Sequence, residues 1–208
     1  MIQVKEMPAN EKLKLVRENF HFSETLAPEF LEKHLGDQAA AELRQVWQSG
    51  IKPTTPEASV EEQFEIAYAN WIWLAHSGFD FIRQKMGEDG MRIYEQAEAE
   101  ALIKKNSGPA TWMLGLMRAV APQTAFKMLS QNLAYQLQWI TPLNITELSS
   151  NRFMAEISRC KILDYPDSED VCLIGCQRIY QRWVEAQFKA NMSFDRRGHA
   201  CTCTVTPL

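Results

Sequence analysis

The sequence lacks the features that mark exported, membrane-spanning and nucleic-acid-binding proteins. No apolar stretch follows the charged residues at its start, so we expect no secretory signal. Its apolar runs are far shorter than the roughly 20 residues needed to cross a bilayer. Lysine and arginine stand next to one another in pairs at most, and the formal net charge is -4. These absences predict a cytoplasmic protein without a membrane or nucleic-acid partner.

Familiar catalytic motifs are missing as well. The sequence holds no phosphate loop, no dinucleotide-binding fingerprint, no HExxH zinc motif and no nucleophile elbow. Its glutamates fall on the polar faces of predicted helices, and no spacing pairs two of them as an acid–base couple. None of the reactions that these motifs identify therefore has a signature in this sequence.

The first two thirds of the chain have the apolar spacing of helices. The predicted helices cover residues 9–20, a segment opening at 23, 38–48, a long segment from 59, 91–105, 110–119 and 122–131. Ser59 and Glu62 form a capping-box pattern at the start of the long segment. Pro53 and Pro56 predict a linker before it. We therefore divide the chain into an N-terminal helical segment, 1–58, and an α+β domain, 59–208.

The spacing changes to alternation near residue 133, which is typical of half-buried strands. Strands are predicted at 133–139, from 143 and at 151–162, followed by a helix at 172–188 and a closing hairpin of 192–196 with 200–206. The predicted fold class is α+β. Helices in the N-terminal two thirds pack on a small antiparallel sheet that carries a C-terminal helix and hairpin.

Cysteine is absent from the first 159 residues, and all five cysteines lie in the last 49. Cys172 and Cys176 are four apart at a predicted helix start, and Cys201 and Cys203 are two apart on a predicted strand, so each pair shares a face. Cys160 falls at a strand end. These elements can bring four thiols together, and soft sulfur ligands suit zinc or another divalent transition metal. The predicted metal ligands are Cys160, Cys172, Cys176 and Cys201.

Two other interpretations of the cysteines stay open. Cysteine is among the most buried residue types, so the five thiols can be ordinary core residues. Alternatively, Cys160 is a catalytic nucleophile, activated by His199 from the Gly198 turn. The tryptophans mostly suit core packing, yet Trp71, Trp112 and Trp139 can also line an apolar ligand pocket.

The C-terminal region resembles the L-2-amino-thiazoline-4-carboxylic acid hydrolase family. The matching strings are Arg159-Cys160 after a strand, Val171-Cys172 before a helix, and the Gly198 turn leading to Cys201-Thr-Cys203. The resemblance covers residues 130–206 and extends more distantly to 4-vinyl reductase ligand-binding domains, in which cysteine-bound zinc lies beside a hydrophobic pocket. The chain departs from the family pattern at Cys176 and in its Cys-Thr-Cys-Thr-Val ending.

The resemblance implies a hydrolase that opens a C–N or C–S bond of a small cyclic amidine or thiazoline-type substrate. A cysteine-bound metal would activate water, or Cys160 would attack the ring carbon. The alternative is a small-molecule-binding protein with an apolar pocket and a structural zinc. A tetrapyrrole- or cluster-linked protein is a third hypothesis. The sequence leaves the oligomeric state open.

Overall fold

The computed structural model describes residues 5–55 and 57–208, and the side chains of 109–112 and 114 lie outside that description. It contains six α-helices, three helical segments of 3₁₀ or π type and four strands among the described residues. The helical elements are α1 (Ala9–Leu35), α2 (Asp37–Gly50), α3 (Val60–Lys105), α4 (Pro109–Val120), α5 (Pro122–Gln136), η1 (Leu137–Trp139), η2 (Lys161–Asp164), η3 (Val171–Tyr180) and α6 (Gln181–Phe188). The strands are β1 (Asn144–Leu148), β2 (Phe153–Ile157), β3 (Ala190–Arg197) and β4 (Ala200–Pro207). The α+β class is confirmed.

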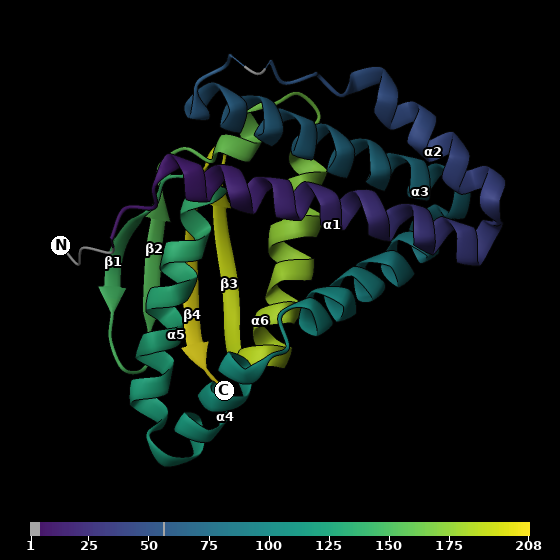
Figure 1. The fold of residues 1–208 in the computed structure, drawn as a ribbon. Coiled ribbons are helices and arrows are strands. Elements are labelled where there is room, and N and C mark those ends of the chain that lie inside the picture. The colour runs from purple at the N-terminus through teal and green to yellow at the C-terminus, as the bar shows by residue number, and fades with distance from the viewer. Residues whose placement is uncertain (1–4, 56) are drawn as a thin grey trace.

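Helices α1, α2 and α3 form the N-terminal bundle, with α1 lying along α3 (Figure 1). The predicted capping box is present, because the Ser59 hydroxyl accepts from the Glu62 amide and the Glu62 carboxylate accepts from the Ser59 amide. One predicted break is wrong, because residues 9–35 form a single helix. The other, before the helix predicted at 91–105, is present as a kink at Gly87, whose φ of 68° and ψ of -170° are not helical and divide α3 into two helical parts.

The predicted strand at 133–139 is also wrong, since these residues form the end of α5 and the turn η1. Leu133 and Leu137 alternate with polar neighbours, but they are also four residues apart. The buried positions Phe126, Leu129, Leu133 and Leu137 repeat at the three- and four-residue spacing of a helix. The apolar residues of the longer segment follow the helical period, and this period, rather than the short alternation, corresponds to the structure that forms.

The four strands form one antiparallel sheet in the order β1-β2-β4-β3. Helix α5 crosses in front of the sheet and α6 lies along β3 (Figure 1). Apolar side chains alternate with polar ones along the strands, so one face of the sheet is apolar and the other polar. The helices cover the apolar face, and Thr202, Thr204 and Asp195 line the polar one. One continuous hydrophobic core joins the covered face to the N-terminal bundle. No described helix is long and apolar enough to cross a bilayer.

Candidate functional site

Four cysteines surround one small cavity on the covered face of the sheet. Cys160 follows β2, Cys172 and Cys176 lie on η3, and Cys201 lies on β4. The cavity has a volume of about 30 Å³, roughly enough for a water molecule or a single metal ion. These four are the residues predicted as metal ligands. Cys203, two residues further along β4, is fully buried and does not line the cavity.

The segment η3 presents its two cysteines from a π-helix, a rare conformation that often occurs at functional sites. The sequence predicted a helix here but not its π-helical form. Cys172 and Cys176, four residues apart, still share a face because a wider turn of about 4.4 residues brings them nearly into line. Asp170, just before η3, forms an ion pair of 2.7 Å with Arg83 of α3, which ties the start of η3 to the bundle.

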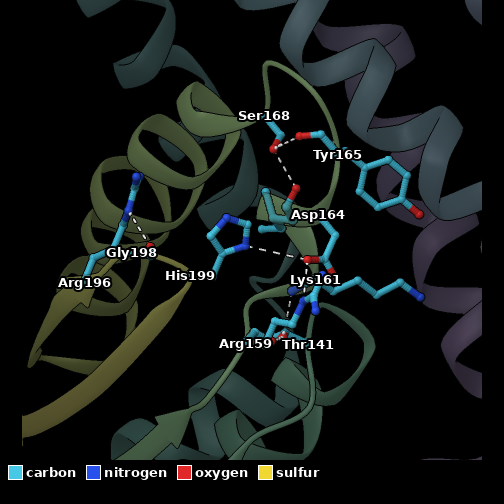
Figure 2. A network of polar contacts seen from close by, with 10 residues as sticks. Thr141, Arg159, Lys161, Asp164, Tyr165, Ser168, Arg196, Gly198 and His199 are labelled. Carbon is cyan, nitrogen blue, oxygen red and sulfur yellow. Dashed lines mark hydrogen bonds and ion pairs between the residues drawn. The ribbon is translucent and has the colours of Figure 1, made fainter.

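The backbone around Cys160 is held on both sides by one buried hydroxyl. Thr141 Oγ1 donates to the carbonyl of Arg159 at 3.3 Å and accepts from the amide of Lys161 at 3.2 Å. The Cys160 amide donates to the carbonyl of His199 at 2.7 Å. Figure 2 shows this network, in which the Arg159 guanidinium and the His199 ring both approach Asp164. Thr141 was missed by the sequence analysis, because a threonine before Pro142 carries no signal of a contact so distant in sequence.

His199 therefore contacts Cys160 through its backbone carbonyl group. The His199 ring lies 3.7 Å from Asp164 and is 58% exposed. Its contacts provide no link from the imidazole to the Cys160 thiol. Backbone hydrogen bonding from Ile162 and Leu163 lowers the pKa of the Cys160 thiol. Burial is the larger effect, and the net result is a raised pKa for Cys160.

Burial also raises the pKa values of the other described thiols for which a shift is resolved. The pKa of Cys201 rises to about 11, and that of Cys176 rises well above its ordinary value. Cys172 and Cys160 add to both increases, since several thiolates in one cavity would repel one another. Without a cation, at least Cys160, Cys176 and Cys201 are therefore neutral thiols at neutral pH.

Cys172 has a different environment from the other thiols. The Arg196 guanidinium hydrogen bonds to its sulfur, and Gln177 Nε2 lies 3.9 Å from the same atom. Arg196 also donates to Glu169 at 2.8 Å and to the carbonyl of Gly198 at 3.2 Å. Arg196 follows Phe194 by two residues and so occupies the covered face of β3. That alternation was the one sequence signal that could have identified it.

The four sulfurs fit a metal ion in chemistry but not in their present positions. Four cysteine sulfurs are a donor set of tetrahedral zinc sites, and the cavity has room for a single ion. Yet among the residues that the structure describes, no group of three or more His, Cys, Asp or Glu side chains is arranged to hold a metal ion. Side chains would have to close around an ion and lose their protons for a site to form.

A second and larger opening lies next to the cysteine cavity. This outer groove has a volume of about 590 Å³, and Asn144, Glu156, Asp195, Arg197 and Cys201 are among its lining residues. Ile157 and Cys201 line both openings and form the wall between them. Asp195 pairs with Arg197 at 2.9 Å, whereas no described side chain pairs with Glu156. No sequence pattern indicates the groove, because its residues gather only through strand register.

The predicted aromatic pocket is packed by its own members where the structure describes them. The Trp71 and Trp139 rings lie 5.0 Å apart, and both contact Tyr68. The Tyr68 hydroxyl donates to the carbonyl of Ile140 at 2.6 Å. The third predicted residue, Trp112, has a side chain outside the described residues. The structure therefore brings Trp71 and Trp139 together as a core cluster near the cysteines.

No protein-family model and no curated protein gives a significant match to this chain.

Proposed function

We propose that this protein binds a small polar molecule in the outer groove. We further propose that a soft metal ion stabilises the wall of this groove, with Cys160, Cys172, Cys176 and Cys201 as its ligands. The observation that carries the proposal is the shared wall, since Cys201 faces both the groove and the four-thiol cavity. Zinc bound by four thiolates has a filled tetrahedral shell and would hold the segment after β2, η3 and β4 together. The groove would keep its shape because its wall is anchored.

The charges of the groove favour a ligand with a cationic head. Glu156 is an unpaired carboxylate, and Asn144 and Thr202 flank it on the neighbouring strands. A planar amidinium group can donate a hydrogen bond to each of the two carboxylate oxygens. Arg197, on the far strand of the groove, offers a cation for an acidic group of the same molecule. A cyclic amidine of the thiazoline type that also bears a carboxylate combines these two groups.

Hydrolysis of such a ligand is the second candidate function. It is favoured by the Glu156 carboxylate, one oxygen of which can take a proton from water inside the groove while the other accepts from the amidinium. The water oxygen would add to the amidine carbon and the ring C–S bond would break. The proton would pass to the departing sulfur, leaving a urea-type carbonyl and a free thiol. Opening at the C–N bond would release an amine instead.

The metal part of the proposal is tested by cobalt titration of the purified protein. Co²⁺ in a tetrahedral thiolate site gives intense visible and thiolate charge-transfer absorption, and zinc should displace it. We expect one equivalent bound in the wild type and in Cys203→Ala, whose thiol lies outside the cavity. Cys176→Ala should lose more than about 100-fold in affinity, because it removes a direct ligand. Equal binding by the two variants, or no binding by the wild type, would overturn the metal site.

The groove is tested with L-2-amino-thiazoline-4-carboxylate as the probe. Calorimetry should detect binding that weakens at least about tenfold in Glu156→Gln, because an ionic hydrogen bond is lost. The matched surface variant Glu185→Gln should bind normally. Release of thiol or amine with time would distinguish hydrolysis from binding alone. Absence of binding to the wild type would contradict the proposed ligand class.

A further inference from the structure

The π-helix η3 is joined to helix α3 by an ion pair near each of its ends. Asp170, which directly precedes η3, pairs with Arg83 at 2.7 Å. Arg178, two residues before the end of η3, pairs with Glu95, also at 2.7 Å. The first contact lies on the part of α3 before the Gly87 kink, and the second lies on the part after it. We call these two ion pairs the η3 clamp.

Burial and a shared guanidinium strengthen the η3 clamp. The Glu95 side chain is only 2% exposed, and Arg178 is the one ion-pair partner that the described residues give it. A buried carboxylate that lost this partner would be strongly disfavoured. Arg83 also pairs with Glu88, one residue beyond the kink, at 2.9 Å. The same guanidinium therefore stabilises both the kink of α3 and the start of η3.

The π-helical form of η3 places Gln177 on the same side as Cys172. Residues five apart are separated by about 50° around the axis of a π-helix but by about 140° in an α-helix. Gln177 Nε2 donates to Cys172 Sγ at 3.9 Å, and both side chains line the four-thiol cavity. Arg196 of β3 hydrogen bonds to the same sulfur, so Cys172 lies between donors from two elements. An α-helix over these residues would turn Gln177 away from the sulfur.

We propose that the η3 clamp holds η3 in its π-helical form, and that this form makes Gln177 a positioning residue for the Cys172 sulfur. A π-helix is wider and shorter than an α-helix of the same sequence, so conversion would move the two ends of η3 relative to each other. The two ion pairs oppose that movement. In the metal-bound protein the Gln177 amide would donate to the Cys172 thiolate and keep it in place as a ligand. Only this role in metal binding rests on the proposed function.

Asp170→Asn tests the η3 clamp in the full-length, metal-free protein. Arg83 keeps Asp80 and Glu88 as partners in this variant, so the bundle should stay folded. NMR of the wild type should show nuclear Overhauser contacts between residues five apart in η3, and Asp170→Asn should lose them. Iodoacetamide should modify Cys172, which is 6% exposed, at least about threefold faster in the variant, because its surroundings open more often.

The second ion pair is tested by combining Arg178→Gln with Glu95→Gln. This double variant removes the pair without leaving a buried charge, and it should behave like Asp170→Asn. Arg178→Lys keeps the charge and should retain the wild-type NMR contacts. Arg182→Gln is the matched control, because Arg182 is exposed on α6 and the described residues form no ion pair with it.

Gln177→Leu tests the positioning role separately from the form of the helix. The variant should keep the NMR contacts of η3, yet iodoacetamide should modify its Cys172 faster than in the wild type. It should also bind Co²⁺ about tenfold more weakly, since a hydrogen bond to a ligand is lost. Gln181→Leu, four residues further along and outside the cavity, should match the wild type in all three measurements.

Several outcomes would overturn the proposal. Absence of contacts between residues five apart in wild-type η3, or their persistence in both Asp170→Asn and the double variant, would refute the clamp. Unchanged modification of Cys172 in Gln177→Leu would refute the positioning role. Failure of the wild type to bind Co²⁺ would instead refute the metal site alone, because the NMR and modification measurements are made on metal-free protein.

Discussion

The N-terminal bundle and the C-terminal sheet region share one core but fill it differently. In the bundle, large side chains such as Leu43, Tyr68 and Ile82 are buried with essentially no exposure. On the covered face of the sheet, large side chains such as Phe153 and Met192 are equally buried, but small residues such as Ala155 and Cys203 lie beside them and four thiols border a cavity. Close packing stabilises a fold, whereas an ion-sized cavity ringed by thiols adds nothing to it unless something binds there. The comparison thus separates a region built for stability from one that holds a site.

The largest expected effect comes from opening a cavity in the bundle. Leu43→Ala removes a fully buried side chain of α2 and should cost about 2–5 kcal/mol in free energy of unfolding. Urea denaturation followed by circular dichroism measures it. Cys203→Ala removes only one sulfur from the sheet region and should cost less. A larger loss for Cys203→Ala would reverse the assignment of stability to the bundle.

A pH effect is expected from Glu98 of α3 in the bundle. Burial raises the pKa of Glu98 to about 7, and its Oε2 has no hydrogen-bond partner. The folded-state pKa lies above the unfolded value, so stability is complete at low pH and falls as the pH rises from about 4.5 through 7.

Glu98→Gln removes this ionisation. We expect the variant to gain stability over the wild type as the pH rises from about 4.5 through 7, reaching on the order of 2 kcal/mol above neutral pH. Thermal melts at pH 5 and pH 8 measure the difference. Glu185→Gln, on the surface of α6, should show no such dependence. An equal effect of Glu98→Gln at both pH values would contradict ionisation as the cause.

The rigidity of the cysteine site is tested at Thr141. Thr141→Val removes the hydroxyl that contacts the backbone on both sides of Cys160 and leaves the Lys161 amide unpaired. It should cost about 1–2 kcal/mol and speed the reaction of Cys160 with a thiol reagent. Mass spectrometry of the labelled peptides measures the rate. Thr146→Val, at an exposed position of β1, should leave it unchanged.

The smallest expected effect is at the start of α3. Ser59→Ala removes the hydroxyl that accepts from the Glu62 amide and should cost about 1 kcal/mol. Chemical denaturation measures this loss, and cobalt binding should be unaffected. A change in cobalt affinity would show that the bundle and the cysteine site are more tightly coupled than their separate packing indicates.

Sequence reasoning succeeded where the signal is local. The capping box at Ser59, the helices α4 and α5, the helical segment after Cys172 and the hairpin around Gly198 all follow from short-range spacing. It failed where two periods overlap, as at Leu133 and Leu137. It also split α1, because a polar stretch inside a helix resembles a break until the partner that buries the helix is known.

By itself the sequence determined the α+β class, because the period of the apolar residues distinguishes helices from strands. It also determined that Cys172 and Cys176 share a face, as do Cys201 and Cys203, because spacing decides which side chains lie together on one element. Only the tertiary structure decided that these thiols border one cavity, that Cys203 stays outside it, and that Cys201 also faces a groove. It alone revealed Thr141 and Arg196 beside the site and separated the His199 ring from the Cys160 thiol. Contacts between distant segments depend on how whole elements pack, and no local pattern encodes that packing.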